Sequence, residues 1–171
     1  HRVQAAGPAV ADNSMMIATE PIRDEHAPLA ATPRVLVFRS CRMAQFLATI
    51  SWIRAQWPAA VIDVVTSPGF DAPLTEAGAA RTFGYLGASF GLARNLPLVR
   101  RLRAETFDHI VIPQMSDVAG HHANLYRAAA AIGARSFVVA AMDSTPVEIE
   151  PRAFGWLTLR ASFERLVNAI D

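Results

Sequence analysis

Two short polar segments of the sequence hold side chains that could bind a ligand or do chemistry. In the first, Ser40 and Arg42 follow the apolar run 34–38 and precede an expected helix. A guanidinium group beside the backbone N–H groups of a helix start can bind an anion, so Ser40 and Arg42 are candidate ligand-binding residues. The plainer alternative is a solvated loop in which Ser40 caps the helix. Cys41 lies beside arginines that would lower its pKa and activate the thiol, unless it is a small buried apolar residue.

The second segment carries the pattern D-x-x-x-H-H, formed by Asp117, His121 and His122. If a helix begins early here, Asp117 and His121 share one face of it, which suits an acid–base pair or two metal ligands. A metal site would need a third donor, such as Asp143 from the next loop. We interpret Asp117 and His121 as ligand-binding candidates and predict no metal site. The alternative is that they are solvent-exposed loop residues.

Composition excludes several classes of function. All sixteen basic residues are arginine, so the chain lacks the lysine used by a Walker-type phosphate loop, a pyridoxal enzyme or a receiver domain. A single cysteine cannot form an internal disulfide or a zinc site of several cysteines. The net charge of +1 offers no bulk field for nucleic acid. We predict no cofactor, no nucleic-acid partner, no membrane-spanning segment and a cytoplasmic location.

The order of apolar patterns predicts an α/β fold. Short β-branched runs predict strands, and amphipathic stretches between them predict helices. Strands are expected at 34–38, 61–65, 82–86, 109–113 and 136–141, and helices at 43–57, 75–80, 92–105, 122–132 and 154–170. This alternation favours right-handed βαβ units, so we predict one Rossmann-like domain, 34–171, with a doubly wound, mostly parallel five-stranded sheet. Residues 1–33, rich in Ala and Pro, are interpreted as a flexible leader.

This fold predicts which loops can form a site. Ligands of open α/β sheets bind beyond the carboxyl ends of the strands. Here those ends are residues 39–42, 66–70, 113–122 and 142–145. The last helix carries many apolar residues, including Phe154, Trp156 and Leu159, and we expect this side to cover the sheet. Docking of a partner on that helix is the alternative.

Two stretches of the sequence are similar to motifs of a known family. Residues 34–68 open with RVLVF and reach the second strand through Pro58, Ile62 and Asp63, close to a P-x-x-x-I-D pattern. The run LRAETFDHIVI, residues 102–112, is close to L-R-x-x-x-F-D-x-V-I-D. In these motifs the chain resembles glycosyltransferase family 9, the heptosyltransferases of lipopolysaccharide synthesis, over about residues 34–142. The resemblance implies the N-terminal, acceptor-side half of a two-domain GT-B enzyme.

The chain departs from that family at two points. The family's first loop reads G-D, with the Asp as general base, but Ala44 and Gln45 stand there, and an amide cannot accept the proton. The chain is also half-length, whereas a GT-B active site lies between two domains. We therefore predict a non-catalytic module that binds a protein partner, a second copy, or a small anionic or sugar ligand. The alternative is the acceptor-binding half of an active enzyme, with the acceptor oriented by Ser40, Arg42, Gln45, Gln114 and His121.

Overall fold

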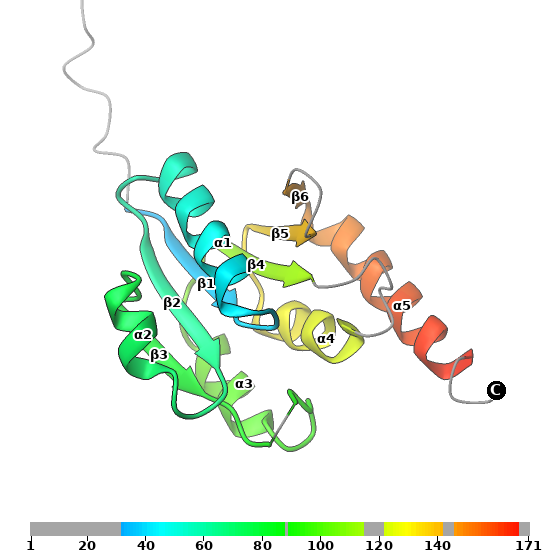
Figure 1. Ribbon diagram of the computed structural model, residues 1–171. Helices are drawn as coiled ribbons and strands as arrows, with labels where there is room; N and C mark the ends of the chain where they lie inside the picture. The colour runs from blue at the N-terminus through cyan, green and yellow to red at the C-terminus, as the bar shows by residue number, and fades with distance from the viewer. Residues whose placement is uncertain (1–31, 88, 115–121, 142–145, 168–171) are drawn as a thin grey trace, which may run out of the picture. The chain divides into compact units, whose positions relative to one another are not determined.

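Six strands form the sheet of this protein (Figure 1). A computed structural model describes residues 32–87, 89–114, 122–141 and 146–167, without the side chains of residues 141 and 163–167. The strands are β1 (Arg34–Phe38), β2 (Val61–Thr66), β3 (Arg81–Gly84), β4 (His109–Gln114), β5 (Ser136–Ala141) and β6 (Val147–Ile149), in the spatial order β3-β2-β1-β4-β5-β6. The first five pair in parallel, as predicted, so their carboxyl ends lie at one edge.

The edge strand β6 makes the sheet six-stranded rather than five-stranded, a difference from the sequence prediction. It has three residues, none of them buried, and pairs antiparallel with β5 through Val147 and Ile149. A strand this short shows too little alternation to be recognised from its sequence. The exposed carboxylate of Glu148 is typical of an edge strand, where a charge discourages pairing with another sheet.

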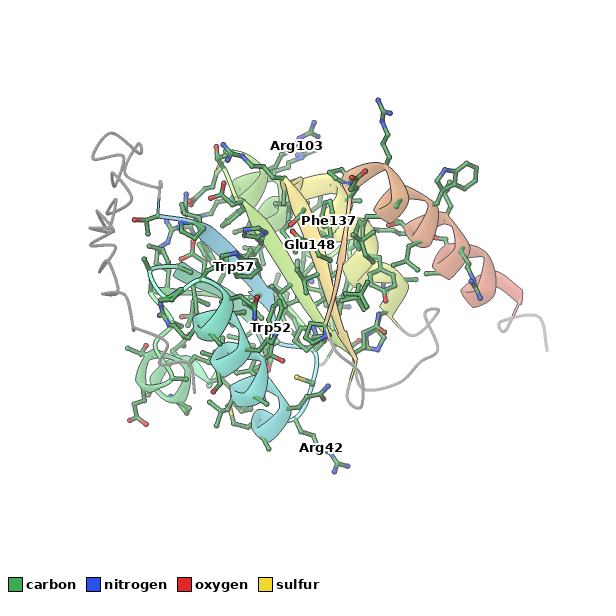
Figure 2. All side chains as sticks on the ribbon, turned by 90° about the horizontal axis from the view of Figure 1, so that it is seen from above. Arg42, Trp52, Trp57, Arg103, Phe137 and Glu148 are labelled. Atoms are coloured by element: carbon green, nitrogen blue, oxygen red, sulfur yellow. The ribbon has the colours of Figure 1, made fainter. Side chains whose placement is uncertain are left out.

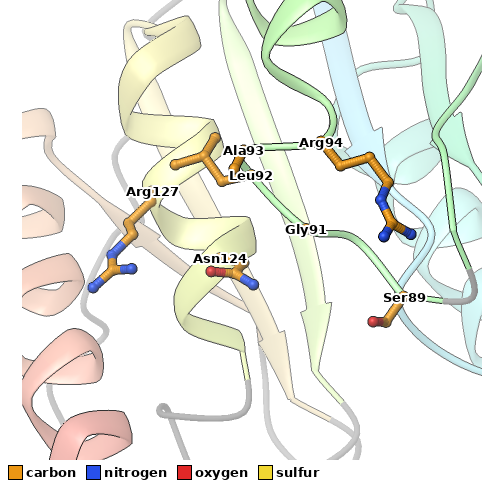
Figure 3. Close-up of a pocket in the computed structure, with 7 residues that line it drawn as sticks. All are labelled: Ser89, Gly91, Leu92, Ala93, Arg94, Asn124 and Arg127. Carbon is orange, nitrogen blue, oxygen red and sulfur yellow. The ribbon is translucent and has the colours of Figure 1, made fainter.

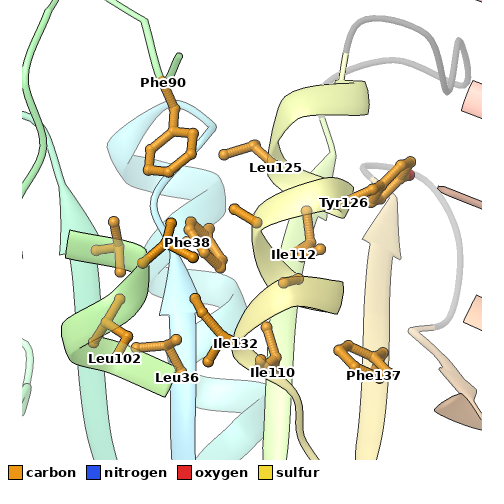
Figure 4. Close-up of a cluster of buried hydrophobic side chains, with 14 of the residues drawn as sticks. Leu36, Phe38, Phe90, Leu102, Ile110, Ile112, Leu125, Tyr126, Ile132 and Phe137 are labelled. Carbon is orange, nitrogen blue, oxygen red and sulfur yellow. The ribbon is translucent and has the colours of Figure 1, made fainter. Parts of the chain in front are cut away.

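Helices cover both faces of the sheet, which is the doubly wound, Rossmann-like arrangement. They are α1 (Met43–Gln56), α2 (Asp71–Glu76), α3 (Leu96–Arg103), α4 (Ala123–Ile132) and α5 (Pro151–Val167). Strand residues alternate between two buried clusters: Val35 and Val37 pack with α1 and α2, whereas Leu36 and Phe38 pack with α3, α4 and α5 (Figure 4). Within the described residues, no helix combines the length and apolarity needed to cross a bilayer.

All five predicted helices are present, but several bounds and buried sides differ from the prediction. α3 begins at Leu96 rather than at 92, and α5 begins at Pro151 rather than at 154. α2 spans Asp71–Glu76 rather than 75–80, with Pro73 tolerated in its first turn. On α1, Leu47 is 42% exposed, although the neighbouring Phe46 is fully buried. On α5, the predicted apolar face is only partly buried: Phe154 is fully buried, but Trp156 and Leu159 face solvent.

At the amino edge of the sheet, ion pairs tie three strands together. The fully buried carboxylate of Asp63, in β2, accepts hydrogen bonds from Arg34 of β1 at 2.9 Å and from Arg81 of β3 at 2.7 and 3.0 Å. Both guanidinium groups also contact Glu105, at 2.6 and 2.7 Å. Hydrogen bonds from Arg81 and Arg34 lower the pKa of Glu105 to about 2. Asp63, one of the residues that carry the family resemblance, therefore has a structural role.

Candidate functional site

Three of the predicted site residues meet at the carboxyl edge, between β1 and β4. The Ser40 hydroxyl donates a hydrogen bond to the backbone oxygen of Pro113 at 2.5 Å. The side-chain amide of Gln45 donates to the backbone oxygen of Gln114 at 2.7 Å. In the sheet, β1 has β2 as its neighbour on one side and β4 on the other. The strands that follow β1 in sequence are first added on the β2 side and then, from β4 onward, on the opposite side, so the strand order reverses between β1 and β4. Open α/β sheets bind ligands at such a switch point.

The loop between β1 and α1 leaves the start of α1 open to this edge. Arg42 is the N-cap residue, in an extended conformation, and no side chain caps the helix. The alternative in which Ser40 caps α1 is therefore wrong, because its hydroxyl donates across to β4 instead. The backbone N–H groups of the first turn of an α-helix have no partner inside the helix and favour a negative charge.

Buried polar atoms accompany this helix start. Within the described part of the chain, the Gln45 Oε1, Arg39 Nε and Thr66 Oγ1 atoms are buried and have no hydrogen-bond partner. Thr66, the last residue of β2, is fully buried, and the Arg39 guanidinium lies 3.5 Å from the centre of the Phe70 ring. Buried polar groups without a partner are costly, and a bound ligand is one way to supply the missing hydrogen bonds.

The charge of the edge favours an anion. Residues 39–42, 67–70 and 85–95, which follow β1, β2 and β3, include Arg39, Arg42 and Arg94 and no acidic residue. The first carboxylate beyond them is Asp71, whose oxygen accepts a hydrogen bond from Thr82 at 2.5 Å. Because the whole chain has a net charge of only +1, this local excess of arginine is a property of these three loops.

Cys41 is not the reactive thiol that its neighbours suggested. The side chain is 7% exposed and packs with the apolar cluster beneath α1. Burial raises the pKa of the thiol to about 11, although the charge of Arg39 acts in the opposite direction. Since the thiolate is the nucleophile, the interpretation as a small buried apolar residue is confirmed.

The second predicted segment lies largely outside the described residues, so Asp117, His121 and Asp143 remain sequence predictions. His122, which is described, is buried and precedes α4 as its N-cap residue. Among the residues that the structure describes, no three His, Cys, Asp or Glu side chains are grouped to hold a metal ion.

Sequence reasoning missed part of this site. Arg39, Thr66 and Phe70 lie in the segments that the strand-end rule selects, but nothing in the sequence shows that an arginine from one loop covers an aromatic ring of another. The contact requires β1 and β2 to be neighbours in register, with Phe38 opposite Val65. Only the paired sheet supplies that information.

Replacing Gln45 with glutamate should lower the free energy of unfolding by about 1–3 kcal/mol at pH 7, because a carboxylate would face the Gln114 carbonyl without a donor. The loss should shrink near pH 4, where a protonated glutamate can donate again. Urea denaturation at both pH values measures the effect. Ala44→Glu places the same charge on the neighbouring, exposed position and should be nearly neutral. Equal losses in both variants would refute the hydrogen bond as the cause.

Comparison with models of known protein families, with curated proteins and with solved structures finds no match in any of the three. The assignment of function therefore depends on the residues and the geometry of this chain.

Proposed function

We propose that this chain is a glycosyltransferase-like, acceptor-side domain that binds a small anionic or sugar ligand at the carboxyl edge of its sheet without acting as a catalyst. Its role would be that of a binding or subunit module. The observation that carries the proposal is the position of Gln45 at the switch point, with its amide nitrogen on the Gln114 carbonyl and its oxygen buried.

The chemistry of Gln45 supports binding without base catalysis. The motif similarity puts this residue where the family has a catalytic carboxylate. An amide can accept and donate hydrogen bonds, and so can orient a hydroxyl group, but it cannot take up the proton of an attacking hydroxyl at neutral pH. Binding of an anionic group is supported by the open start of α1 and by Arg42 beside it.

The proposal is tested by titrating the protein with inorganic phosphate, a hexose 1-phosphate and the corresponding neutral hexose, followed by amide NMR shifts. We expect the phosphate ester to perturb the amides of residues 43–45. Arg42→Ala should weaken its binding about tenfold, the loss of roughly 1.4 kcal/mol of charge-assisted hydrogen bonding. Arg103→Ala is the matched control, because Arg103 is also exposed but lies at the opposite end of the sheet (Figure 2).

Two results would contradict the proposal. Equal weakening by Arg42→Ala and Arg103→Ala, or no shift at residues 43–45, would remove the binding site. Turnover of a nucleotide sugar by this chain alone would instead support the alternative of an active glycosyltransferase half. That assay should follow release of the nucleotide over hours, with Gln45→Ala as the comparison.

A further inference from the structure

A second part of the carboxyl edge forms a cavity of about 550 Å³ between the loop that follows β3 and the helix α4 (Figure 3). This size is within the range of pockets that hold small molecules. Its lining comes from different residues than the β1–β4 site: Ser89, Gly91, Leu92, Ala93, Arg94, Asn124 and Arg127.

Hydrogen bonds and a ring contact hold the described residues of the loop that forms one wall, 85–87 and 89–95. Asn95, which is 2% exposed, accepts a hydrogen bond from the Leu86 backbone at 2.6 Å and donates to the Gly91 carbonyl at 2.9 Å. The Phe90 ring packs edge-on against Phe38 at the end of β1, with ring centres 5.7 Å apart. These contacts build the wall before any ligand arrives, which lowers the entropic cost of binding.

Both arginines of the cavity have defined surroundings. The Nε atom of Arg127 donates a hydrogen bond to the Ser162 hydroxyl of α5 at 2.9 Å, and this contact restricts the orientation of the guanidinium group. The Arg94 side chain lies against Gly87, where an added Cβ would be 3.0 Å from its terminal nitrogen. Gly87 has a φ of +104°, which disfavours other residues, so glycine both permits the turn and leaves space for the arginine.

The composition of the lining selects a class of ligand. Its described residues supply two guanidinium groups, one hydroxyl and one amide, and none of them is acidic or aromatic. Guanidinium groups bind phosphate and carboxylate, while serine and asparagine hydrogen-bond to hydroxyl groups. Among the lining residues that the structure describes, no side chain offers a stacking partner for a nucleotide base.

We propose that this cavity is a binding site for a small hydroxylated anion, such as a sugar that carries a phosphate or carboxylate group, with Arg94 and Arg127 as its anion-binding residues. Figure 3 shows the two side chains on opposite sides of the cavity, with Asn124 and Leu92 between them. Asn124 and Ser89, in the same lining, can form hydrogen bonds with hydroxyl groups of the ligand. This inference does not depend on the proposed function.

The test is titration with a hexose 6-phosphate, a hexuronate and the neutral hexose, followed by calorimetry and by amide shifts of residues 89–94 and 124–127. Arg94→Ala and Arg127→Ala should each weaken binding of at least one of the two anions about tenfold, and the neutral hexose should bind weakly or not at all. Arg100→Ala, which removes an exposed arginine of α3 outside the lining, should leave affinity unchanged. The replaced side chains are exposed, so we expect all three variants to fold, which circular dichroism verifies.

The same titration separates this site from the one between β1 and β4. If Arg42→Ala weakens binding while Arg94→Ala and Arg127→Ala do not, the ligand binds at the switch point and the cavity proposal is wrong. If the cavity variants lose affinity and Arg42→Ala does not, the cavity proposal holds and the proposed function loses its support. Absence of binding by both anions at millimolar concentration would overturn the cavity proposal.

Discussion

Replacing Phe154 with alanine should lower the free energy of unfolding by about 3–5 kcal/mol. The side chain is fully buried on α5, and its ring stacks on Phe137 of β5 with centres 4.0 Å apart. It also meets Tyr126 of α4 edge-on at 5.6 Å. Loss of the ring would leave a cavity among three elements that cannot close without moving the helix from the sheet. Urea denaturation followed by circular dichroism measures the change.

Trp156→Ala is the matched control, because it removes a larger ring from the same helix. Trp156 is 76% exposed, so its loss should change stability by less than about 0.5 kcal/mol. A mild effect of Phe154→Ala would contradict the packing of α5 on the sheet. A large, concentration-dependent effect of Trp156→Ala would instead mean that the outer side of α5 is buried against a partner or a second copy.

The exposed face of α5 shows where sequence reasoning fails. Apolar residues occur on more than one side of this helix, at Phe154, Trp156, Leu157 and Leu159, so periodicity does not select the side that is buried. Buried parallel strands present the opposite case. Runs such as 34–38 are apolar on both faces, and their order with the helices was enough to predict the parallel sheet.

The candidate site was predicted in its position but not in its contacts. The strand-end rule selected Ser40 and Gln114 as residues at the ends of predicted strands, and in the structure the Ser40 hydroxyl donates to Pro113, the residue before Gln114. For Cys41 the sequence left two readings open, because neighbouring charges can be read from sequence whereas depth of burial cannot; in the structure, burial outweighs the charge of Arg39 and raises the pKa of the thiol. Hydrogen bonds such as that of Gln45 depend on distances between elements, which the sequence does not contain.

Replacing Arg81 with methionine should lower the free energy of unfolding by about 3 kcal/mol, the lower end of the range for a broken buried ion pair. Two of its nitrogens contact Asp63, whose carboxylate is fully buried. Only the hydrogen bond from Arg34 would then remain at this carboxylate among the contacts that the structure describes. The cost therefore comes from an under-compensated buried charge, not from the loss of one ion pair as such.

Arg135→Met provides the control, because it breaks an ion pair whose partner Asp108 is 25% exposed and can be hydrated. That variant should lose at most about 1 kcal/mol. Adding Asp63→Asn to Arg81→Met should recover part of the loss, since a neutral amide needs less compensation than a carboxylate. Chemical denaturation of the unmodified protein, the two single variants Arg81→Met and Asp63→Asn and the double variant gives the coupling. Equal losses for Arg81→Met and Arg135→Met, without recovery by Asp63→Asn, would show that Asp63 does not depend on Arg81. The aspartate of the motif in residues 58–63 would then not be explained by its buried ion pairs, which join β1, β2 and β3.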